Sequence, residues 1–319
     1  MTATALESSI VDEARRLGFA AIGFAAAGDS CSSGVFEEWL EEGGAAGMGY
    51  LHRHAPLRRH PATIAPSVRS VIAVAARYPV NPNPGDGFCM TARARDYHDV
   101  IRGKLRELAA FLGARTPQRC ARICVDSAPL PEREWAIRAG LGWQGRQGQL
   151  IVPGAGACTV LGFLLTDLDL QPAIPQENRC GDCRRCVESC PPRAILPSGR
   201  IAAGRCISYL TIEHRGGIAP ALEPAMGQAL FGCDICTAVC PWNRTATDPV
   251  MPELESDALV QPDAAAVAAM TPGDFAVRFR GTAVQRSGLD RLQRNARIAL
   301  RNASVIPDRG ISACQPPTA

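Results

Sequence analysis

Eight cysteines between residues 180 and 240 constrain this chain more than any other feature. The first four follow the pattern C-x2-C-x2-C-x3-C-P, which runs from Cys180 to Pro191. A second group, C-x2-C-x3-C-P, runs from Cys233 to Pro241, and Cys206 lies alone between the two groups. The first pattern is the spacing of bacterial ferredoxins, in which the fourth cysteine ligates a second iron–sulfur cluster. The sequence therefore predicts a two-cluster 4Fe–4S segment.

The same crossover divides the eight cysteines into two complete sets of four. One predicted cluster has the ligands Cys180, Cys183, Cys186 and Cys240. The other predicted cluster has the ligands Cys190, Cys206, Cys233 and Cys236. Zinc is an alternative, but zinc ribbons prefer two separated C-x2-C pairs to four ligands in one short loop. Disulfides are the other alternative, and they are typical of small secreted domains.

Composition sets broad limits on the rest of the chain. With 319 residues, of which 46% are hydrophobic, the chain can bury a core and form two domains. The net charge of +3 permits a polyanionic partner without requiring one. The N-terminal residues show no basic region followed by an apolar run, and no uncharged apolar stretch reaches membrane-spanning length. We expect a cytoplasmic protein with no membrane association.

Strands and helices alternate over residues 1–170, which predicts an α/β-type domain there. Ser67–Tyr78 has a nearly continuous apolar centre, as expected of a strand buried on both faces. Asp96 is a plausible N-cap for a long amphipathic helix that includes Val100 and Leu112. The polar residues 52–60, rich in histidine and arginine, are expected to form a solvated loop.

Asp126 follows another predicted strand, Arg119–Asp126. In open α/β sheets, ligand-facing residues gather at the carboxyl ends of strands, so Asp126 is a candidate functional residue. The alternative is a structural one, in which Asp126 caps a short helix that begins near Leu130.

The end of the chain is expected to be helical. A ferredoxin-like module should occupy residues 171–245, and a short HEAT-like helical region with a frayed tail should occupy residues 246–319. The predicted helices are Asp263–Met270, Phe275–Phe279 and Leu289–Asn302. This region is dense in arginine: Arg278, Arg280, Arg286, Arg291, Arg294, Arg297 and Arg301. Such density suits a phosphate-facing surface, although a solvated helix face explains any one of these residues equally well.

Four strings carry a specific resemblance, over nearly the whole chain. They are Asp126–Pro129 (DSAP), Ala139–Trp143 (AGLGW), Arg205–Gly216 (RCISYLTIEHRG) and Phe231–Asn243, which ends in CPWN. Together they resemble epoxyqueuosine reductase, a cobalamin-dependent iron–sulfur family that acts in the last step of queuosine synthesis in tRNA. The expected fold is mixed α/β (α+β): an N-terminal cobalamin-binding α/β domain, a two-cluster ferredoxin module and a short C-terminal helical segment.

The resemblance implies a reaction and a site. The reaction is the reduction of epoxyqueuosine to queuosine at the wobble position of the tRNA anticodon, with electrons passing from the clusters to cobalamin. Asp126 would be the proton donor, and burial beside the corrin would raise its pKa. The cluster held by Cys206 and its set would lie near the corrin. The implied cobalamin contacts are Arg58, Tyr97, Asp126, Gln149, Ser208 and the backbone of Cys233, Asp234, Ile235 and Cys236. Arg215, with its neighbours Glu213 and His214, would face the RNA.

The implied partners are tRNA and an external electron donor of the flavodoxin or ferredoxin type, and we expect a monomer. Two alternatives remain from the residues alone: a reductive-dehalogenase-like reductase of a small molecule, or a non-catalytic two-cluster electron carrier. The cobalamin signature D-x-H-x-x-G begins at Asp96 and His98, but Ile101 replaces its glycine. Cobalamin is therefore expected from the resemblance only.

Overall fold

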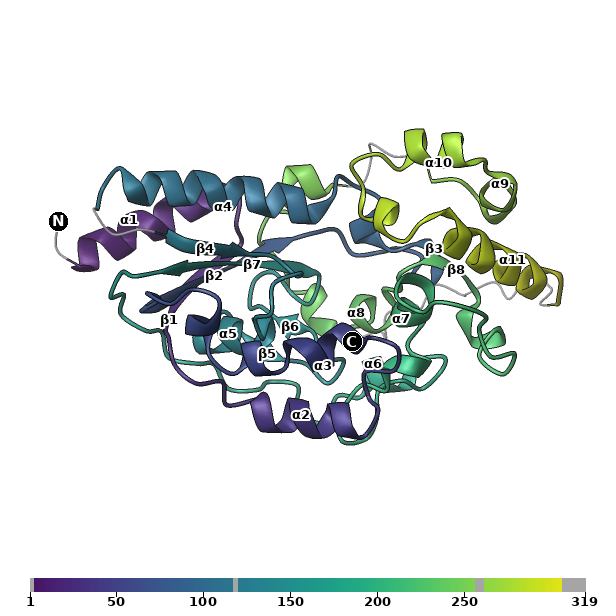
Figure 1. Cartoon of the computed structure of the whole chain (residues 1–319), viewed down its shortest axis with the longest axis horizontal. Coiled ribbons are helices and arrows are strands. Elements are labelled where there is room, and N and C mark those ends of the chain that lie inside the picture. The colour runs from purple at the N-terminus through teal and green to yellow at the C-terminus, as the bar shows by residue number, and fades with distance from the viewer. Residues whose placement is uncertain (1–2, 117–119, 256–260, 306–319) are drawn as a thin grey trace, which may run out of the picture.

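The computed structural model describes residues 3–116, 120–255 and 261–305. Its centre is a four-stranded sheet in which every pair of neighbouring strands is antiparallel (Figure 1). In spatial order its strands are β1 (Ala21–Ala26), β2 (Ser70–Arg77), β7 (Thr159–Thr166) and β4 (Cys120–Cys124). The mixed α/β class is confirmed. The strands of this sheet are antiparallel, so the rule for open, mostly parallel α/β sheets, which placed Asp126 at a ligand-binding edge, does not apply.

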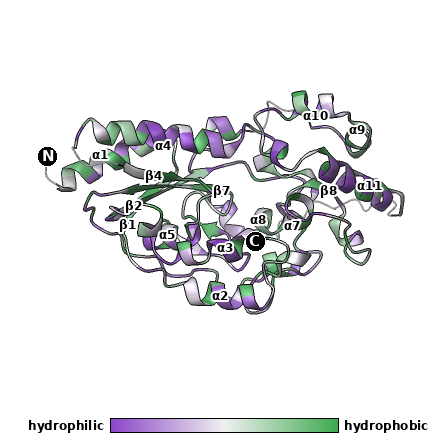
Figure 2. Ribbon diagram, viewed as in Figure 1, coloured by the Kyte–Doolittle hydropathy of each residue, from purple (hydrophilic) through white to green (hydrophobic). Residues whose placement is uncertain are grey.

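Strand β2 is buried on both faces, as its apolar run predicts. Ile72 and Val74 belong to a core cluster on one face of the sheet, while Val71 and Ala73 belong to a second cluster on the other face. Side chains alternate between the faces of a strand, so both clusters must be covered by other elements. A strand covered on both sides reads as a continuous apolar run whether its neighbours are parallel or antiparallel. Figure 2 shows the sheet strands β4 and β7 in the green of hydrophobic residues.

Helices α1 (Ala3–Arg16) and α4 (Tyr97–Gly113) cover one face of the sheet. The other face packs against α5 (Glu132–Arg138) and the hairpin of β5 (Trp143–Gln144) and β6 (Leu150–Ile151). Asp96 caps α4 as predicted, since its side chain accepts a hydrogen bond from the backbone N–H of His98. This cap fixes where α4 begins and therefore where His98 lies.

The predicted polar loop at residues 52–60 is a correction, because most of it is helical. It contains α3 (Gly49–His54) and the short 3-10 helix Pro56–Arg58, and a second one follows at Pro61–Thr63. Proline begins both 3-10 helices, where its fixed φ suits the first helical position. The helix α2 (Ser33–Glu41) precedes them.

The second half of the chain packs around a small parallel pair, β3 (Asp86–Phe88) and β8 (Gln228–Phe231). Its helices are α6 (Arg185–Glu188), α7 (Ile207–Ile212), α8 (Ile235–Ala238), α9 (Ala264–Ala269), α10 (Pro272–Arg278) and α11 (Leu289–Val305). Helix α11 packs on β8 and α9, so the C-terminal helices predicted from sequence are confirmed (Figure 1). The tail at residues 306–319 lies outside the described residues.

None of the helices within residues 3–116, 120–255 and 261–305 combines the length and apolar character that a membrane span requires.

Candidate active site

Asp126 lies in the turn that follows β4, with a backbone φ of 55°. This left-handed conformation is uncommon for residues other than glycine and is concentrated at functional sites. Glu132, the first residue of α5, stabilises the turn because its carboxylate accepts a 2.6 Å hydrogen bond from the Asp126 backbone N–H. The Asp126 side chain does not cap α5 and remains 60% exposed. The structural alternative for Asp126 is therefore not observed.

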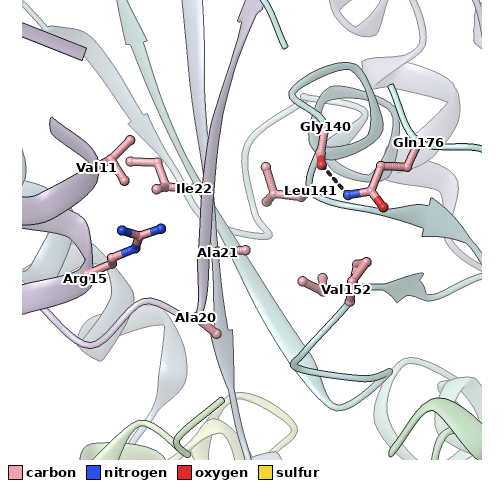
Figure 3. Close-up of a pocket in the computed structure, with 10 residues that line it drawn as sticks. Val11, Arg15, Ala20, Ala21, Ile22, Gly140, Leu141, Val152 and Gln176 are labelled. Atoms are coloured by element: carbon pink, nitrogen blue, oxygen red, sulfur yellow. Dashed lines mark hydrogen bonds between the residues drawn. The ribbon is translucent and has the colours of Figure 1, made fainter. Parts of the chain in front are cut away.

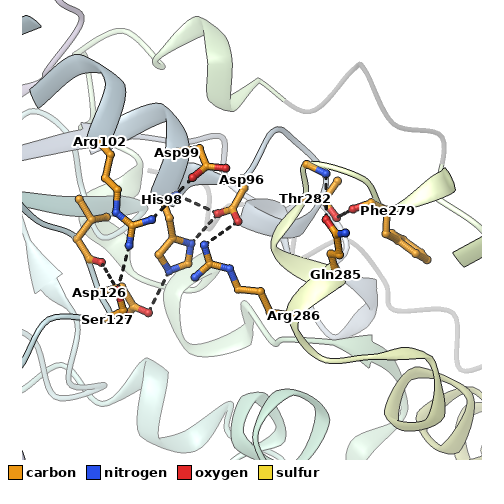
Figure 4. Close-up of polar contacts among 12 residues, drawn as sticks. Asp96, His98, Asp99, Arg102, Asp126, Ser127, Phe279, Thr282, Gln285 and Arg286 are labelled. Atoms are coloured by element: carbon orange, nitrogen blue, oxygen red, sulfur yellow. Dashed lines mark hydrogen bonds and ion pairs between the residues drawn. The ribbon is translucent and has the colours of Figure 1, made fainter. Parts of the chain in front are cut away.

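His98 joins Asp126 to a second carboxylate (Figure 4). Its Nε2 lies 3.1 Å from Asp126 Oδ2, and its Nδ1 lies 2.6 Å from Asp96 Oδ1. Arg286, from the C-terminal region, contacts the other oxygen of Asp96 at 3.0 Å. The His98 and Asp96 side chains are only 5% and 6% exposed. The site is thus a chain of charged groups that leads from exposed Arg286 through buried Asp96 and His98 to the exposed carboxylate of Asp126.

The pKa of Asp126 departs from the expectation. The hydrogen bond from His98 lowers it, and this effect outweighs the opposing effect of burial. Burial opposes the charged form of His98, but its hydrogen bonds to Asp126 and Asp96 outweigh burial and raise its pKa. Asp126 is therefore paired with a cation in the protein itself, and the predicted rise of its pKa, which depends on burial beside a corrin, stays a prediction.

Several groups around Asp126 are accessible to water yet desolvated by the surrounding protein. Burial raises the pKa of Glu132 to about 7, although this residue remains partly accessible. Burial also lowers the pKa of Arg133 and of Arg58, and Arg133 is exposed. Burial raises the pKa of Tyr50 to about 12, and the carboxylates of Glu213 and Asp126 add to the rise, so α3 and the end of α7 face this region.

The other predicted contacts are distributed around this region. Tyr97 stacks on His98 with ring centroids 4.0 Å apart, and burial together with nearby Asp126 raises its pKa. Arg58 lies over the Phe36 ring at 4.7 Å. Three further predicted residues are placed as follows: Gln149 is exposed beside β6, Ser208 is half-buried in α7, and Arg215 is exposed after α7. Within the described residues, none of these three side chains hydrogen-bonds to Asp126.

Asp234 has a structural role that the sequence did not reveal. Its buried carboxylate accepts hydrogen bonds from Asn81 Nδ2 at 2.9 Å and from the Met90 backbone N–H at 2.8 Å. Burial raises its pKa despite both bonds. The side chain is committed to these contacts, which leaves the backbone of Cys233–Cys236 as the part available to a cofactor.

The first cysteine set gathers around Cys240. Cys180 and Cys240 share an apolar cluster with Trp143. Burial raises the pKa of the Cys240 thiol to about 11, and the nearby thiols of the Cys180–Cys186 loop add to the rise.

The second set gathers around Cys236. Cys206 and Cys233 belong to another apolar cluster. Burial raises the pKa of Cys236 to about 12, with contributions from the thiols of Cys206 and Cys190. Helix α6, which carries Cys186 of the first set, packs against α8, which carries Cys236 of the second. Within the described ranges, no three His, Cys, Asp or Glu side chains converge as ligands of a single metal ion. This is compatible with a 4Fe–4S cluster, because each of its cysteine ligands binds a different iron atom and the ligands therefore lie further apart.

Several C-terminal arginines serve the fold, so their density alone does not mark an RNA-facing surface. Arg294 donates hydrogen bonds to the carbonyls of Leu210, His214 and Gly216 at 2.6–2.9 Å. Others also bind within the chain: Arg286 to Asp96, Arg291 to the carbonyl of Ile212 and Arg301 to Glu223. Arg280 and Arg297 are exposed.

Sequence reasoning missed His98, Glu132 and Arg286 as members of the site. The string Asp96-Tyr-His98 gave a signal for His98, because a cap and the side chain two residues later lie close together. Nothing in the sequence indicated Arg286, which is 190 residues from Asp96.

A pocket of about 230 Å³ lies elsewhere, between α1, β1 and the segment that follows α5 (Figure 3). Arg15 and Gln176 contribute to its lining, and no predicted site residue does.

Comparison with known protein families identifies both parts of this arrangement. Residues 179–243 match the family model of a 4Fe-4S double cluster binding domain. Residues 58–127, which include Tyr97, His98 and Asp126, match the family model described as Epoxyqueuosine reductase QueG, DUF1730. The fold and the site therefore define an iron–sulfur oxidoreductase.

Similarity to whole proteins is more specific. The chain is 36% identical to the epoxyqueuosine reductase of Alicycliphilus denitrificans, over 91% of this chain and 85% of that protein. It is also 36% identical to the Escherichia coli enzyme, over 90% of this chain and 78% of the relative. The chain belongs to the epoxyqueuosine reductase family. This confirms the resemblance and the enzyme class over the electron-carrier and dehalogenase-like alternatives.

Solved structures agree. A crystal structure of epoxyqueuosine reductase with an epoxyqueuosine-modified tRNA-Tyr stem loop matches with a TM-score of 0.86 and 29% identity, over 94% of this chain and 82% of that one. The Bacillus subtilis enzyme matches with a TM-score of 0.82 and 28% identity, over 95% of this chain and 84% of that one. The structure of the B. subtilis enzyme is described as having the loop of a catalytic aspartate swung out of the active site.

Proposed function

We propose that this chain reduces epoxyqueuosine to queuosine at the wobble position of a tRNA anticodon. The observation that carries the proposal is the Asp126–His98 pair, in a chain that also holds a double-cluster module. The relative crystallised with an epoxyqueuosine-modified stem loop supports tRNA as the substrate. The catalytic aspartate loop of the B. subtilis relative supports Asp126, which lies on a turn with a strained backbone, as the proton donor.

The residues present fit a bound cobalamin. Charged and aromatic side chains gather around Asp126, among them Tyr50, Tyr97 and Arg133, which suits a large cofactor with polar side arms. Gln147 Nε2 is buried and has no hydrogen-bond partner within the described residues, and it lies two positions before the predicted contact Gln149. When bound, cobalamin supplies the two-electron chemistry that iron–sulfur clusters, which pass single electrons, cannot supply alone.

The chain's own residues would bind the cofactor and protonate the substrate. The cofactor would be held by Arg58, Tyr97, Gln149, Ser208 and the Cys233–Cys236 backbone. Asp126 places a proton on the epoxide oxygen, which must leave as water, and exposed Arg215 contacts the RNA. The two cysteine sets hold one cluster each, with the Cys206 set nearer the cofactor. The flavodoxin- or ferredoxin-type donor, the monomeric state and the cytoplasmic location stay predictions.

The test is anaerobic reconstitution with iron, sulfide and cobalamin, followed by turnover of epoxyqueuosine-containing tRNA. We expect queuosine to form and Asp126→Asn to reduce its formation by about 10²-fold or more while cobalamin binds normally. Asp99→Asn is the matched control, because it removes an exposed carboxylate three residues from Asp96. A reconstituted enzyme that forms no queuosine contradicts the proposed function. An Asp126→Asn variant with parental turnover contradicts only the role of Asp126.

A further inference from the structure

The proposed reaction consumes two protons, and Asp126 can supply only one at a time. Opening the epoxide requires a proton on its oxygen, and the resulting hydroxyl leaves as water only with a second proton. The two electrons delivered by the enzyme form the carbon–carbon double bond. The inference below rests on the proposed function and concerns the source of the second proton.

Bulk water is a poor source of that proton once the substrate is bound. The Asp126 side chain is 60% exposed in the free protein, and it must face the epoxide during the reaction. A nucleoside in that position covers the exposed part of Asp126 and excludes water from it. The other neighbour of the Asp126 carboxylate is the His98 ring, which is itself only 5% exposed.

The structure fixes the His98 ring in an orientation suited to proton transfer. Asp96 Oδ1 accepts hydrogen bonds from both the backbone N–H of His98, at 3.0 Å, and ring Nδ1, at 2.6 Å. Arg286 holds the other Asp96 oxygen at 3.0 Å, so the Asp96 carboxylate cannot rotate freely. With Nδ1 committed to Asp96, Nε2 points at Asp126 Oδ2 (Figure 4). A histidine held in this way keeps one ring nitrogen protonated while the other exchanges its proton.

We infer that His98 is the proton reserve of the reaction and acts through Asp126. Asp126 gives its proton to the epoxide oxygen and becomes a carboxylate. His98 then transfers its Nε2 proton to Asp126 Oδ2 and becomes neutral, with Nδ1–H still bound to Asp96. Asp126 gives this second proton to the departing hydroxyl. After the product leaves and Asp126 is exposed, His98 is protonated again from solvent, and Asp126 takes up its proton when the next substrate covers it.

The charged groups that face this chain come from several elements. They are Asp96 before α4, Asp126 after β4, Glu132 and Arg133 in α5, and Arg286 from the C-terminal region. The carboxylates of Asp96 and Asp126 contact the ring and favour the imidazolium, whereas Arg133 and Arg286 lower the pKa of Asp126. Because the reserve is the protonated ring, the reaction should weaken as pH rises through the pKa of His98, which lies above 6.5 in the folded protein.

The test uses the reconstituted full chain and combines kinetics with NMR. Single-turnover rates are measured against pH for the parent, His98→Gln, Asp96→Asn and the control Asp99→Asn. We expect His98→Gln to lower the rate about 10²-fold and to lose the decline at high pH, while cobalamin and tRNA binding are unchanged. Asp96→Asn should shift the decline to lower pH, because it removes one of the two charges that stabilise the imidazolium. Asp99→Asn should keep the parental profile.

The NMR measurement is independent of turnover. The chain has five histidines, so ¹⁵N-labelled histidine gives few signals, and His98→Gln assigns its own. A His98 signal that titrates above pH 6.5 supports the inference, and a His98 ring that is neutral down to pH 6.5 overturns it. If His98→Gln does not fold, Asp96→Asn assigns the His98 signal instead, because it shifts that signal. A His98→Gln variant with the parental pH profile also overturns it. If the parent itself forms no queuosine, the proposed function fails instead.

Discussion

Asn295 in α11 offers a sharp test of how the second cysteine set is held in place. Its side chain is fully buried, and its Nδ2 donates hydrogen bonds to the carbonyls of Thr211 at 2.9 Å and Leu230 at 2.8 Å. Thr211 lies in α7, which begins directly after Cys206, and Leu230 lies in β8, which leads into Cys233. One amide group therefore ties together the two segments that carry these cysteines.

The expected effect of Asn295→Ala follows from the two carbonyls that lose their donor. An unpaired buried polar group costs about 1–3 kcal/mol, so two of them destabilise the fold by about 2–6 kcal/mol. Asn302→Ala is the matched control on the same helix. Its Nδ2 also donates to two carbonyls, those of Glu223 and Gly227, both at 2.8 Å. Asn302 is only partly buried, and its acceptors lie in the loop between the two cysteine-bearing segments.

The assay is the iron and sulfide content after anaerobic reconstitution, together with the thermal unfolding midpoint of the full chain. We expect Asn295→Ala to unfold at a clearly lower temperature and to lose up to half of its iron. Asn302→Ala should change the midpoint less and keep both clusters. If the two variants lose the same amount of iron, or if Asn295→Ala keeps all of it and unfolds with the parent, the reasoning about this contact is refuted.

Two further predictions concern the cysteine sets and the buried carboxyl of Glu132. Cys240→Ala should remove about half of the iron, whereas Cys158→Ala, which changes a buried cysteine outside both sets, should remove none; full iron in Cys240→Ala would contradict the crossover. Glu132 holds its proton more tightly when folded, with a pKa of about 7, so ionisation destabilises the folded parent as pH rises from about 4.5 to about 7. Glu132→Gln should therefore gain stability relative to the parent across that range in unfolding midpoints measured against pH, and parallel curves would contradict this.

The sequence predicted the elements better than their arrangement. The apolar run of β2 and the cap at Asp96 are local signals, and both correspond to what the structure shows. The direction of neighbouring strands is not a local property, since a strand covered on both faces looks the same in parallel and antiparallel sheets. The rule for mostly parallel sheets, from which the position of Asp126 was argued, does not hold here for this reason.

The arginines of α11 show a second limit. Arg294 and Arg297 are three residues apart on one helix, yet Arg294 binds three carbonyls after Cys206 while Arg297 is exposed. Their density alone could not separate arginines that hold the fold from arginines that face a partner. The same limit applies to Arg286, whose ion pair with Asp96 depends on the packing of segments distant in the sequence.

The low pKa of Asp126 and its proposed role as a proton donor are compatible, because the two belong to different states of the site. In the free protein, Asp126 is exposed and paired with protonated His98, and both conditions favour its carboxylate form. A substrate that covers Asp126 removes its water, which raises the pKa of this carboxylate, whereas the His98 ring is already buried and keeps Asp96 as its partner. Asp126 then takes up a proton as the substrate binds, and His98 keeps its own Nε2 proton in reserve. Substrate binding, rather than the fold alone, would then convert Asp126 into an acid at the moment when a proton is needed.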